Sequence, residues 1–384
     1  MLHMQPTRRT ALLTALSASR ILGANDRIRV AGIGVGGRAR GLLERVVKVP
    51  GAELTTVCDV YEPRLALFPQ AATSRDYRAV LDRKDIDAVV IGSPDHWHVK
   101  MTLDAMAAGK DVYVEKPLTR TVEEGDFMLK AYASTKQIVQ VGYQQRNTDT
   151  FLRAKEQLDA GAIGQVTMAL TYWYQNYNFK TPDSLEADPS KLDWNAWLGS
   201  APKRPFDKMR FKIWRWFWDY GGGTLTDLFS HWVDSVHWLM GESKPQLVMA
   251  SGSVYRNKLL EAPDTVSGSW RYPKFMVSYE STMVTSVEDG GIVFRGTGGM
   301  MKVNRSEVAV YPEQGARGDR LPEPTFRFKA VTDGTAEHIT NWLDCVRTRK
   351  APASNIADAV AAARAAHWGN QSIREEKPVR PGAA

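Results

Sequence analysis

The chain has 384 residues, of which 43% are hydrophobic and 24% charged, a length and composition typical of a globular protein with two domains. The net charge is +7, but Arg8, Arg9 and Arg20 precede the first acidic residue, Asp26, and without these three arginines the charge is +4. This surplus is too small to argue for a nucleic-acid partner, and we expect none.

Residues 1–24 resemble a removable leader. Arg8 and Arg9 stand directly before a weakly apolar run over residues 11–18, as in twin-arginine signals, which direct proteins that fold before crossing a membrane. We therefore expect export to the periplasm. The alternative is a disordered basic tail on a cytoplasmic protein. No apolar run reaches the 18 or so residues of a membrane span, so membrane insertion is not expected.

A glycine-rich turn follows the first predicted strand, residues 27–33. The turn fits the pattern G-x-G-x-x-A and consists of Gly34, Gly36, Gly37, Arg38 and Ala39, with Val35 between the first two. The first glycine allows a tight turn, the second lets the backbone approach a pyrophosphate, and the alanine keeps the new helix close to the sheet. The pattern predicts a dinucleotide site.

A second strand, residues 53–60, supports this prediction because it ends near Asp59, which is 25 residues after Gly34. An acid in this place accepts hydrogen bonds from the adenosine ribose and repels a 2′-phosphate, which favours NAD over NADP. Arg64 lies nearby and would soften the preference.

Strands and helices keep alternating up to residue 141. The predicted elements are a helix at 77–83, a strand at 86–91, a helix from the turn at 93–95 to about 108, a strand at 111–114, a helix at 121–134 and a strand at 138–141. This order predicts a doubly wound parallel sheet of the Rossmann kind over residues 25–143.

Glu115-Lys116-Pro117 directly follows the strand at 111–114. The carboxyl ends of parallel strands surround the crevice that holds the ligand, so the strand ends at Gly34, Ser93 and Glu115 are expected around one crevice, into which Lys116 points. An ammonium there would assist proton transfer to or from an alcohol. The alternative is a lysine with a purely structural role.

Metal binding is not predicted. Cys58 and Cys345 are far apart and form no CxxC pair, so we expect two buried, inert thiols. His96 and His98 flank Trp97 at a helix start, but residues two apart point away from each other on a helix and no third ligand follows. His98 is expected to hold the loop beside the cofactor, whereas His96 receives no role.

Residues 144–384 predict a second, α+β domain. Its expected elements are a helix at 151–160, a strand at 165–172, a long aromatic-rich irregular stretch ending at 214–220, strands at 246–254, 266–272, 275–282, 290–295 and 301–311, and helices at 336–348 and 356–376. Several strands with short turns predict a large, open, mainly antiparallel sheet. The last helices are expected to pack back on the first domain, and the open face to bind further copies in a homodimer or homotetramer.

A helix introduced by three glycines carries Asp227 and His231, four residues apart and therefore on one face. Asp227 is expected to orient the imidazole and favour its protonated form, so that His231 exchanges a proton with a substrate hydroxyl. The alternative is a surface pair, and Asp234 and His237 on the same helix show how easily such pairs arise.

Together these motifs resemble the family of glucose-fructose oxidoreductase, inositol dehydrogenase and rhizopine-catabolism oxidoreductases (Gfo/Idh/MocA), over nearly everything after residue 25. The resemblance rests on the glycine turn, on residues 58–60, 93–98, 108–110 and 115–117, and on residues 221–227 with His231. It implies that Lys116 contacts the reacting hydroxyl, with Asp227 and His231 completing the proton-transfer group. The residues that it implies around the cofactor are Ser93, Pro94, His98 and Glu115 at the nicotinamide and Asp59 at the ribose.

Two departures from the family pattern concern the pocket. Ala39 replaces a commoner glycine, and Leu228-Phe229-Ser230 replaces a smaller segment between the helix acid and His231. The second change leaves the substrate open. Residues that suit a sugar are the stacking surfaces Tyr174, Trp214, Trp216 and Trp218, and Arg146 as a hydroxyl or carboxylate partner.

The resemblance implies hydride transfer from a secondary alcohol of a sugar or cyclitol to NAD while His231 or Lys116 takes the proton. An alternative within the family is an NAD-dependent glycoside hydrolase that oxidises, eliminates, adds water and reduces again, with NAD held tightly. Export suits both, because a folded protein can carry its cofactor across. A third alternative is a non-catalytic sugar or nucleotide sensor, which would not need Lys116, Asp227 and His231 together.

Overall fold

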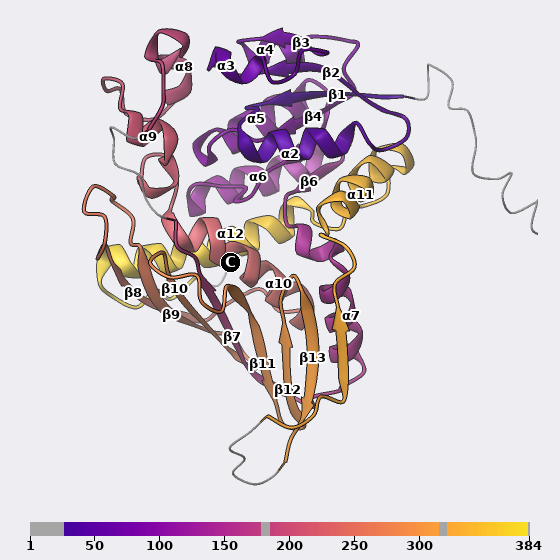
Figure 1. The fold of residues 1–384 in the computed structure, drawn as a ribbon, viewed down its shortest axis with the longest axis vertical. Helices are drawn as coiled ribbons and strands as arrows, with labels where there is room; N and C mark the ends of the chain where they lie inside the picture. The colour runs from indigo at the N-terminus through magenta and orange to yellow at the C-terminus, as the bar shows by residue number, and fades with distance from the viewer. Residues whose placement is uncertain (1–26, 178–184, 315–320, 383–384) are drawn as a thin grey trace, which may run out of the picture.

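The computed structural model describes residues 27–177, 185–314 and 321–382. The expected leader, residues 1–24, lies outside the described residues. Two sheets, each accompanied by helices, lie one above the other in Figure 1, and the C-terminal helices run between them. Within the described ranges, no helix has the length and apolar character needed to cross a membrane.

The first sheet has six parallel strands in the order β3-β2-β1-β4-β5-β6. Its strands are β1 (Ile28–Ile33), β2 (Ala52–Cys58), β3 (Ala72–Ser74), β4 (Ala88–Ile91), β5 (Asp111–Val114) and β6 (Val139–Val141). The inner strands β4 and β5 are buried at every residue, because helices cover both faces of the sheet. The order reverses between β1 and β4, which places a ligand crevice at their carboxyl ends. The predicted Rossmann fold is confirmed.

The helices of this part are α2 (Gly37–Val46), α3 (Glu62–Leu65), α4 (Tyr77–Leu81), α5 (Asp95–Ala107) and α6 (Val122–Ser134). Two of them begin at residues whose side chains cap the helix: Asp76 accepts from the Arg78 amide before α4, and Thr121 from the Glu124 amide before α6. By contrast, α2 begins at Gly36 without a side-chain cap.

The second sheet has eight strands in the linear order β14-β13-β12-β11-β7-β10-β9-β8. They are β7 (Val166–Tyr174), β8 (Leu247–Ser253), β9 (Thr265–Arg271), β10 (Met276–Thr282), β11 (Gly290–Gly296), β12 (Gly299–Val303), β13 (Glu307–Pro312) and β14 (Phe326–Lys329). All neighbours are antiparallel except β7 and β10, so the predicted mainly antiparallel open sheet is confirmed.

The prediction of one strand over residues 301–311 is wrong. Asn304 Oδ1 accepts hydrogen bonds from the amides of Ser306 and Glu307, and this turn divides the segment into β12 and β13. Both β12 and β13 are apolar, so the sequence alone predicts one continuous strand.

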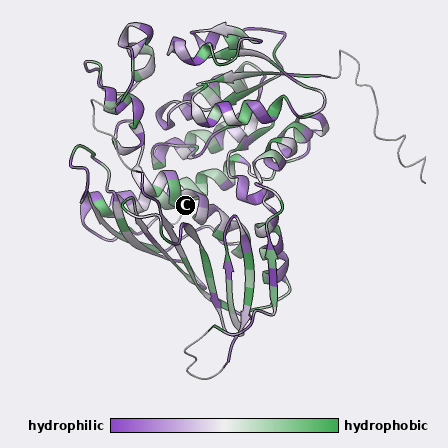
Figure 2. Ribbon diagram, in the orientation of Figure 1, coloured by the Kyte–Doolittle hydropathy of each residue, from purple (hydrophilic) through white to green (hydrophobic). Residues whose placement is uncertain are grey.

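Helices cover one face of this sheet. The helical segments of this part are η2 (Gln144–Asn147), α7 (Asp149–Asp159), η4 (Pro189–Lys191), α8 (Trp194–Leu198), α9 (Lys208–Lys212), η5 (Trp214–Trp216), the π-helix η6 (Leu225–Phe229), α10 (Ser230–Met240), α11 (Thr335–Thr348) and α12 (Ile356–Glu375). Trp232 on α10 donates to the Tyr172 carbonyl of β7, and Trp270 on β9 donates to the Ala365 carbonyl of α12. Figure 2 shows that the helices carry both hydrophobic and hydrophilic stretches, as expected for elements with one buried face.

The last two helices pack against the first sheet and its helices. Trp342 on α11 lies edge-on to Tyr113 of β5, with ring centres 5.7 Å apart. On α6, a Cβ added to Gly125 would lie 2.8 Å from the Val360 side chain of α12. The C-terminal segment therefore completes the core of the N-terminal half.

Candidate active site

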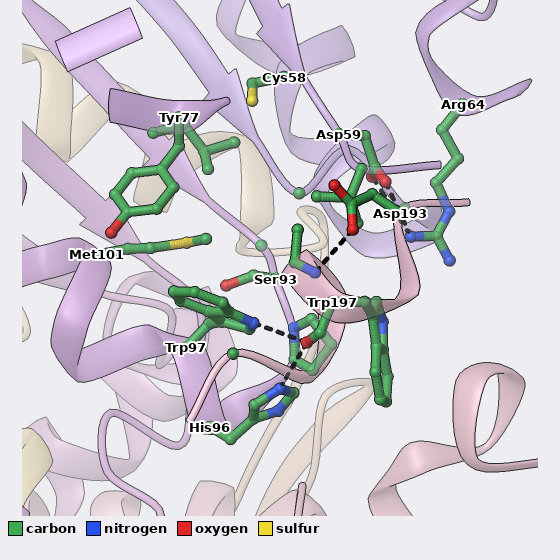
Figure 3. Close-up of a pocket in the computed structure, with 18 of the residues that line it drawn as sticks. Cys58, Asp59, Arg64, Tyr77, Ser93, His96, Trp97, Met101, Asp193 and Trp197 are labelled. Atoms are coloured by element: carbon green, nitrogen blue, oxygen red, sulfur yellow. Dashed lines mark hydrogen bonds and ion pairs between the residues drawn. The ribbon is translucent and has the colours of Figure 1, made fainter. Parts of the chain in front are cut away.

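A cavity of about 710 Å³ lies at the carboxyl ends of β1, β2 and β4. Its floor is the glycine turn, with Asp59 and Ser93 beside it, and its other wall comes from residues 193–215 of the second half (Figure 3). In the described part of the chain, no cluster of three or more His, Cys, Asp or Glu side chains is arranged to hold a metal ion.

The glycine turn has the geometry that a dinucleotide requires. Gly34 has φ +73°, and a Cβ there would lie 2.6 Å from the backbone of Ser93, so only glycine fits. A Cβ on Gly37 would meet nothing within 4 Å. The start of α2 therefore has room beside it and no side-chain cap, which fits a pyrophosphate. Ala39 is fully buried and approaches Gly92 closely, as the fingerprint predicts.

Asp59 is 4% exposed and lines the cavity. Its Oδ1 accepts from the Tyr61 amide at 2.9 Å, and Arg64 Nη1 lies 3.3 Å from Oδ2. Burial raises the pKa of the Asp59 carboxyl, and Arg64 acts against this shift. Arg64 also lies over the Phe211 ring at 5.1 Å, so a residue of the second half holds it in place.

Residues 188–215, here called the strap, close one side of the cavity. The Asp193 amide donates to the Val60 carbonyl at 3.0 Å. Figure 3 shows Trp97 and His96 both directed at the Trp197 carbonyl, at 2.9 and 3.0 Å. Burial lowers the pKa of His96 to about 4, so the ring is neutral and Nε2 carries the donated proton. His96, for which the sequence predicts no role, thus holds the strap against the first half through a hydrogen bond.

Lys116 lies where the sequence predicts. Its Nζ donates to the Asp227 carbonyl at 2.6 Å and to Asp227 Oδ1 at 2.7 Å, with both side chains about nine-tenths buried. The peptide bond between Lys116 and Pro117 is cis. Arg215 Nε donates to the same Oδ1 at 3.0 Å. Although burial raises the pKa of the Asp227 carboxyl, Lys116 and Arg215 lower it to about 2.

His231 does not pair with Asp227. Its Nδ1 lies 3.2 Å from Gln145 Oε1, and its ring stacks on Trp173 with centres 6.0 Å apart. The π-turn η6 contains Asp227 and widens the helix, so residues four apart no longer stand one above the other. Burial lowers the pKa of His231 well below its usual value, and Lys116, Arg305 and Arg38 act in the same direction. The prediction of a protonated imidazole oriented by Asp227 is therefore wrong.

The residues expected around the nicotinamide occupy neighbouring strand ends. His98 Nδ1 lies 2.7 Å from the Pro117 carbonyl and Nε2 lies 2.8 Å from the Ser93 carbonyl, so His98 ties two loops together. Pro94 is the N-cap of α5. The buried Ser93 Oγ has no hydrogen-bond partner among the described residues, which fits a site for a polar ligand. Glu115 is held by Arg38 at 2.8 Å.

The structure places the expected sugar-binding residues apart. Arg146 is 7% exposed and is bound by Asp234 at 2.9 Å and Asp358 at 3.2 Å, so its charge is already paired. Trp216 is 2% exposed and belongs to the core. These placements do not support substrate contacts for either residue.

The other three aromatic side chains differ among themselves. Tyr174 lies on β7, with its hydroxyl 3.4 Å from Glu280 Oε2. Trp218 is partly buried under Arg374, which lies 5.2 Å from its ring centre. Trp214 lines the cavity, with Arg215 4.3 Å from its ring centre. Of the group, Trp214 is the residue whose placement fits a ligand best.

Four site residues were not predicted. Arg215 and Gln145 hold Asp227 and His231, Arg305 lies against Trp173 at 5.0 Å, and Asp95 is buried beside the Lys116 cluster. Burial raises the pKa of Asp95 well above its usual range. Only Asp95, directly after Pro94 in a predicted strand-end turn, had a signal in the sequence.

Comparisons with known proteins agree with this geometry. Residues 28–143 match an oxidoreductase family with an NAD-binding Rossmann fold, and residues 162–380 match the C-terminal alpha/beta domain of that family. The chain is 25% identical over 352 residues to scyllo-inositol 2-dehydrogenase (NAD(+)) of Bacillus subtilis (strain 168), covering 87% of this chain and 90% of that protein. Glycosyl hydrolase family 109 protein 2 of Shewanella sp. (strain ANA-3) is 38% identical over 112 residues, 26% of this chain and 25% of that protein.

Among solved structures, levoglucosan dehydrogenase in complex with NADH has the same fold. Its TM-score is 0.74 at 20% identity, covering 93% of this chain and all of that one. The family matches together span most of the chain and include both sheets. The chain therefore belongs to the Gfo/Idh/MocA oxidoreductase family and is an NAD-dependent oxidoreductase.

Proposed function

We propose that the protein is a dehydrogenase that moves hydride between NAD and a secondary alcohol of a sugar, a sugar derivative or a cyclitol. The observation that carries this proposal is the position of Lys116, fixed by two hydrogen bonds to Asp227 at the carboxyl end of β5. NAD bound in the cavity would supply the hydride acceptor or donor. The 25% identical inositol dehydrogenase supports the class of substrate.

Residues of this chain accept the proton that leaves the substrate hydroxyl. Lys116 donates two of its N–H groups to Asp227, and its third N–H is available to bind the substrate oxygen. Because His231 is neutral and its Nδ1–H faces Gln145 Oε1, its Nε2 is the free acceptor. We assign Lys116 to orienting the hydroxyl and His231 to accepting its proton.

The test is turnover of a panel of sugars and cyclitols by the purified protein, followed by the absorbance of reduced NAD. Lys116→Met should lower kcat/KM about 1000-fold while NAD still binds, because the loss concerns the reacting hydroxyl. The exposed Lys130→Met serves as the control and should keep the wild-type rate. A sensor would instead bind a sugar without turning it over, and Lys116→Met would leave that binding unchanged.

One observation favours the glycoside hydrolase as a second candidate. The strap forms a wall of the cofactor cavity and is fastened through Trp197, which suits a cofactor that stays bound through a cycle without net redox change. Release of nitrophenol from nitrophenyl glycosides with no build-up of reduced NAD would support it. Reduction of added NAD by a free sugar would exclude it.

We also propose that NAD is held tightly, on the same observation. Protein purified without added nucleotide should then contain NAD or NADH. Trp197→Ala removes side-chain packing of the strap and should raise the dissociation rate of the nucleotide. Rapid loss of nucleotide from the wild-type protein during gel filtration would contradict the proposal.

Two further proposals concern the whole molecule. The paired arginines support twin-arginine export, which replacing Arg8 and Arg9 by lysine should abolish in cell fractionation. The open second sheet supports a homodimer or homotetramer, because its strands carry exposed apolar side chains, Met168 on β7 and Met249 on β8. Light scattering after gel filtration should show that Met168→Lys dissociates the oligomer.

A further inference from the structure

The turn between β12 and β13 carries an arginine without a carboxylate partner. Arg305 lies 5.0 Å from the ring centre of Trp173 and 5.8 Å from that of Trp232. Its Nε is buried and has no hydrogen-bond partner in the described ranges, where Arg305 forms no ion pair either. The indole rings cover the face of the guanidinium but leave its in-plane N–H groups unpaired.

Arg305 borders the reacting centre. Trp173, against which Arg305 lies, also stacks on His231 with ring centres 6.0 Å apart. Arg305 acts electrostatically on the pKa values of His231 and Tyr177, and Arg38 and Asp289 act on the pKa of Arg305 in opposite directions. Tyr177 in turn is influenced by Asp227 and Arg215. Lys116 and Arg305 both act on His231, so both border the same centre.

The charges around this centre do not balance. Arg38 is paired with Glu115, and Asp227 alone faces both Lys116 and Arg215. Burial favours the neutral form of Asp95, since it raises the pKa of that carboxyl. Burial and Arg38 lower the pKa of Arg305 to about 10, while the carboxylate of Asp289 acts against this shift, and the guanidinium stays charged at neutral pH. No carboxylate among the described residues forms an ion pair with Arg305, so an uncharged sugar would leave this guanidinium unpaired.

We propose that the substrate is a sugar carrying a carboxylate, such as a uronic or aldonic acid, and that Arg305 binds this carboxylate while Lys116 holds the reacting hydroxyl. The proposal rests on the proposed dehydrogenase function and narrows its substrate class. A single planar guanidinium with its face covered matches one carboxylate edge-on, whereas a phosphate or diphosphate is usually held by several donors from more than one group.

The experiment compares charged and neutral sugars with NAD-loaded protein. Rates of NAD reduction and calorimetric binding are measured for D-glucuronate, D-galacturonate and D-gluconate, against D-glucose, D-galactose and glucose 6-phosphate. We expect at least one carboxylated sugar to exceed its neutral counterpart at least about tenfold in kcat/KM. Arg305→Met should lower kcat/KM for that sugar about 10- to 100-fold, mainly through KM, and change neutral sugars less than about threefold.

Two variants guard the interpretation. Arg305→Lys keeps the charge and should restore part of the loss, which a misfolded protein would not do. Arg295→Met removes an exposed arginine of β11 and should behave as wild type. Equal effects of Arg305→Met on charged and neutral sugars, or a preference for glucose 6-phosphate, would overturn the proposal.

Failure of the proposed function would look different. If none of the sugars reduced NAD, calorimetry would still decide: binding of a carboxylated sugar that Arg305→Met abolishes would support the carboxylate site and reject the dehydrogenase. Binding of no carboxylated sugar would reject the carboxylate site itself.

Discussion

Two aspartates on neighbouring turns of one helical segment have opposite surroundings. Asp227 lies in the π-turn η6 and binds Lys116 and Arg215, which come from the cofactor cleft and the strap. Asp234, on α10, is fully buried and binds Arg146. Burial raises the pKa of both carboxyls, but the two cations outweigh it at Asp227, whereas at Asp234 the pKa stays raised.

The comparison shows that spacing alone does not distinguish a reacting group from a structural one. Each aspartate has a histidine close behind it, yet His231 faces Gln145 and His237 faces the Tyr272 hydroxyl at 2.6 Å. What differs is the origin of the cation. Lys116 comes from the strand end beside the cofactor crevice, while Arg146 belongs to η2 and also binds Asp358.

The largest expected effect separates the two aspartates directly. Asp227→Asn should lower kcat/KM about 1000-fold, because Lys116 loses the charge that fixes its ammonium, and should also lower the melting temperature, because Lys116 and Arg215 lose their buried carboxylate. Steady-state kinetics and thermal melts on the same preparation check this result. Wild-type kinetics in Asp227→Asn would remove the distinction between the two sites.

Asp234→Asn should differ from Asp227→Asn by leaving turnover intact. Leaving Arg146 without its main buried partner should destabilise the fold by about 3 kcal/mol, measured by denaturant unfolding. The folded fraction should keep its kcat. A stable protein with impaired turnover would instead assign Asp234 to the reaction.

His231 provides a sharper test within the site. His231→Gln should lower kcat about 100-fold if its Nε2 accepts the proton. Because its pKa is depressed, the wild-type kcat/KM should keep its plateau below pH 6.5 and fall only in more acidic solution. His237→Gln is the matched control and should leave this pH profile unchanged. An acid limb centred at or above pH 6.5 would contradict the assignment.

The last prediction concerns acid stability, which depends on several buried histidines together. Burial lowers the pKa values of His96, His338 and His367 to about 4. Below pH 6.5 these histidines bind protons in the unfolded chain but stay neutral in the folded protein. Each histidine should therefore lower the free energy of unfolding by about 1.4 kcal/mol per pH unit, down to about pH 4. The raised pKa values of Asp59 and Asp95 act in the opposite direction.

Urea unfolding at several pH values between 7 and 4.5 measures this slope. Replacing His367 by Gln should reduce it by the share of one residue. Unfolding free energy that stays constant across this range would show that these rings gain protons without leaving the folded state.

The first half of the fold was predictable because its physics is local. The strands β1, β4 and β5 are apolar runs bounded by turn residues, and the glycine turn carries its own geometric signal. Lys116 followed from its place after a strand. In the second half, the break at Asn304 was hidden between apolar runs, and the burial of Trp216 depends on neighbours distant in sequence.

The site was only partly predictable for the same reason. A helix period places Asp227 near His231, but the π-turn that separates them has no simple sequence signature. Arg146 is a plausible ligand for a carboxylate until Asp234 and Asp358 are brought to it by folding. Arg305 lies in an ordinary polar turn, and only the packing of two tryptophans on it makes it distinctive.

The strand order of the second sheet determines how late in synthesis this sheet and the cores beside it can be completed. β7 leaves the ribosome long before its partners β10 and β11, and α11 and α12, which complete both halves, come last. Such late, distant pairings are slow to form and leave apolar faces uncovered meanwhile. A chain whose synthesis stops before residue 335 would therefore have two unfinished cores and would be a substrate for chaperones.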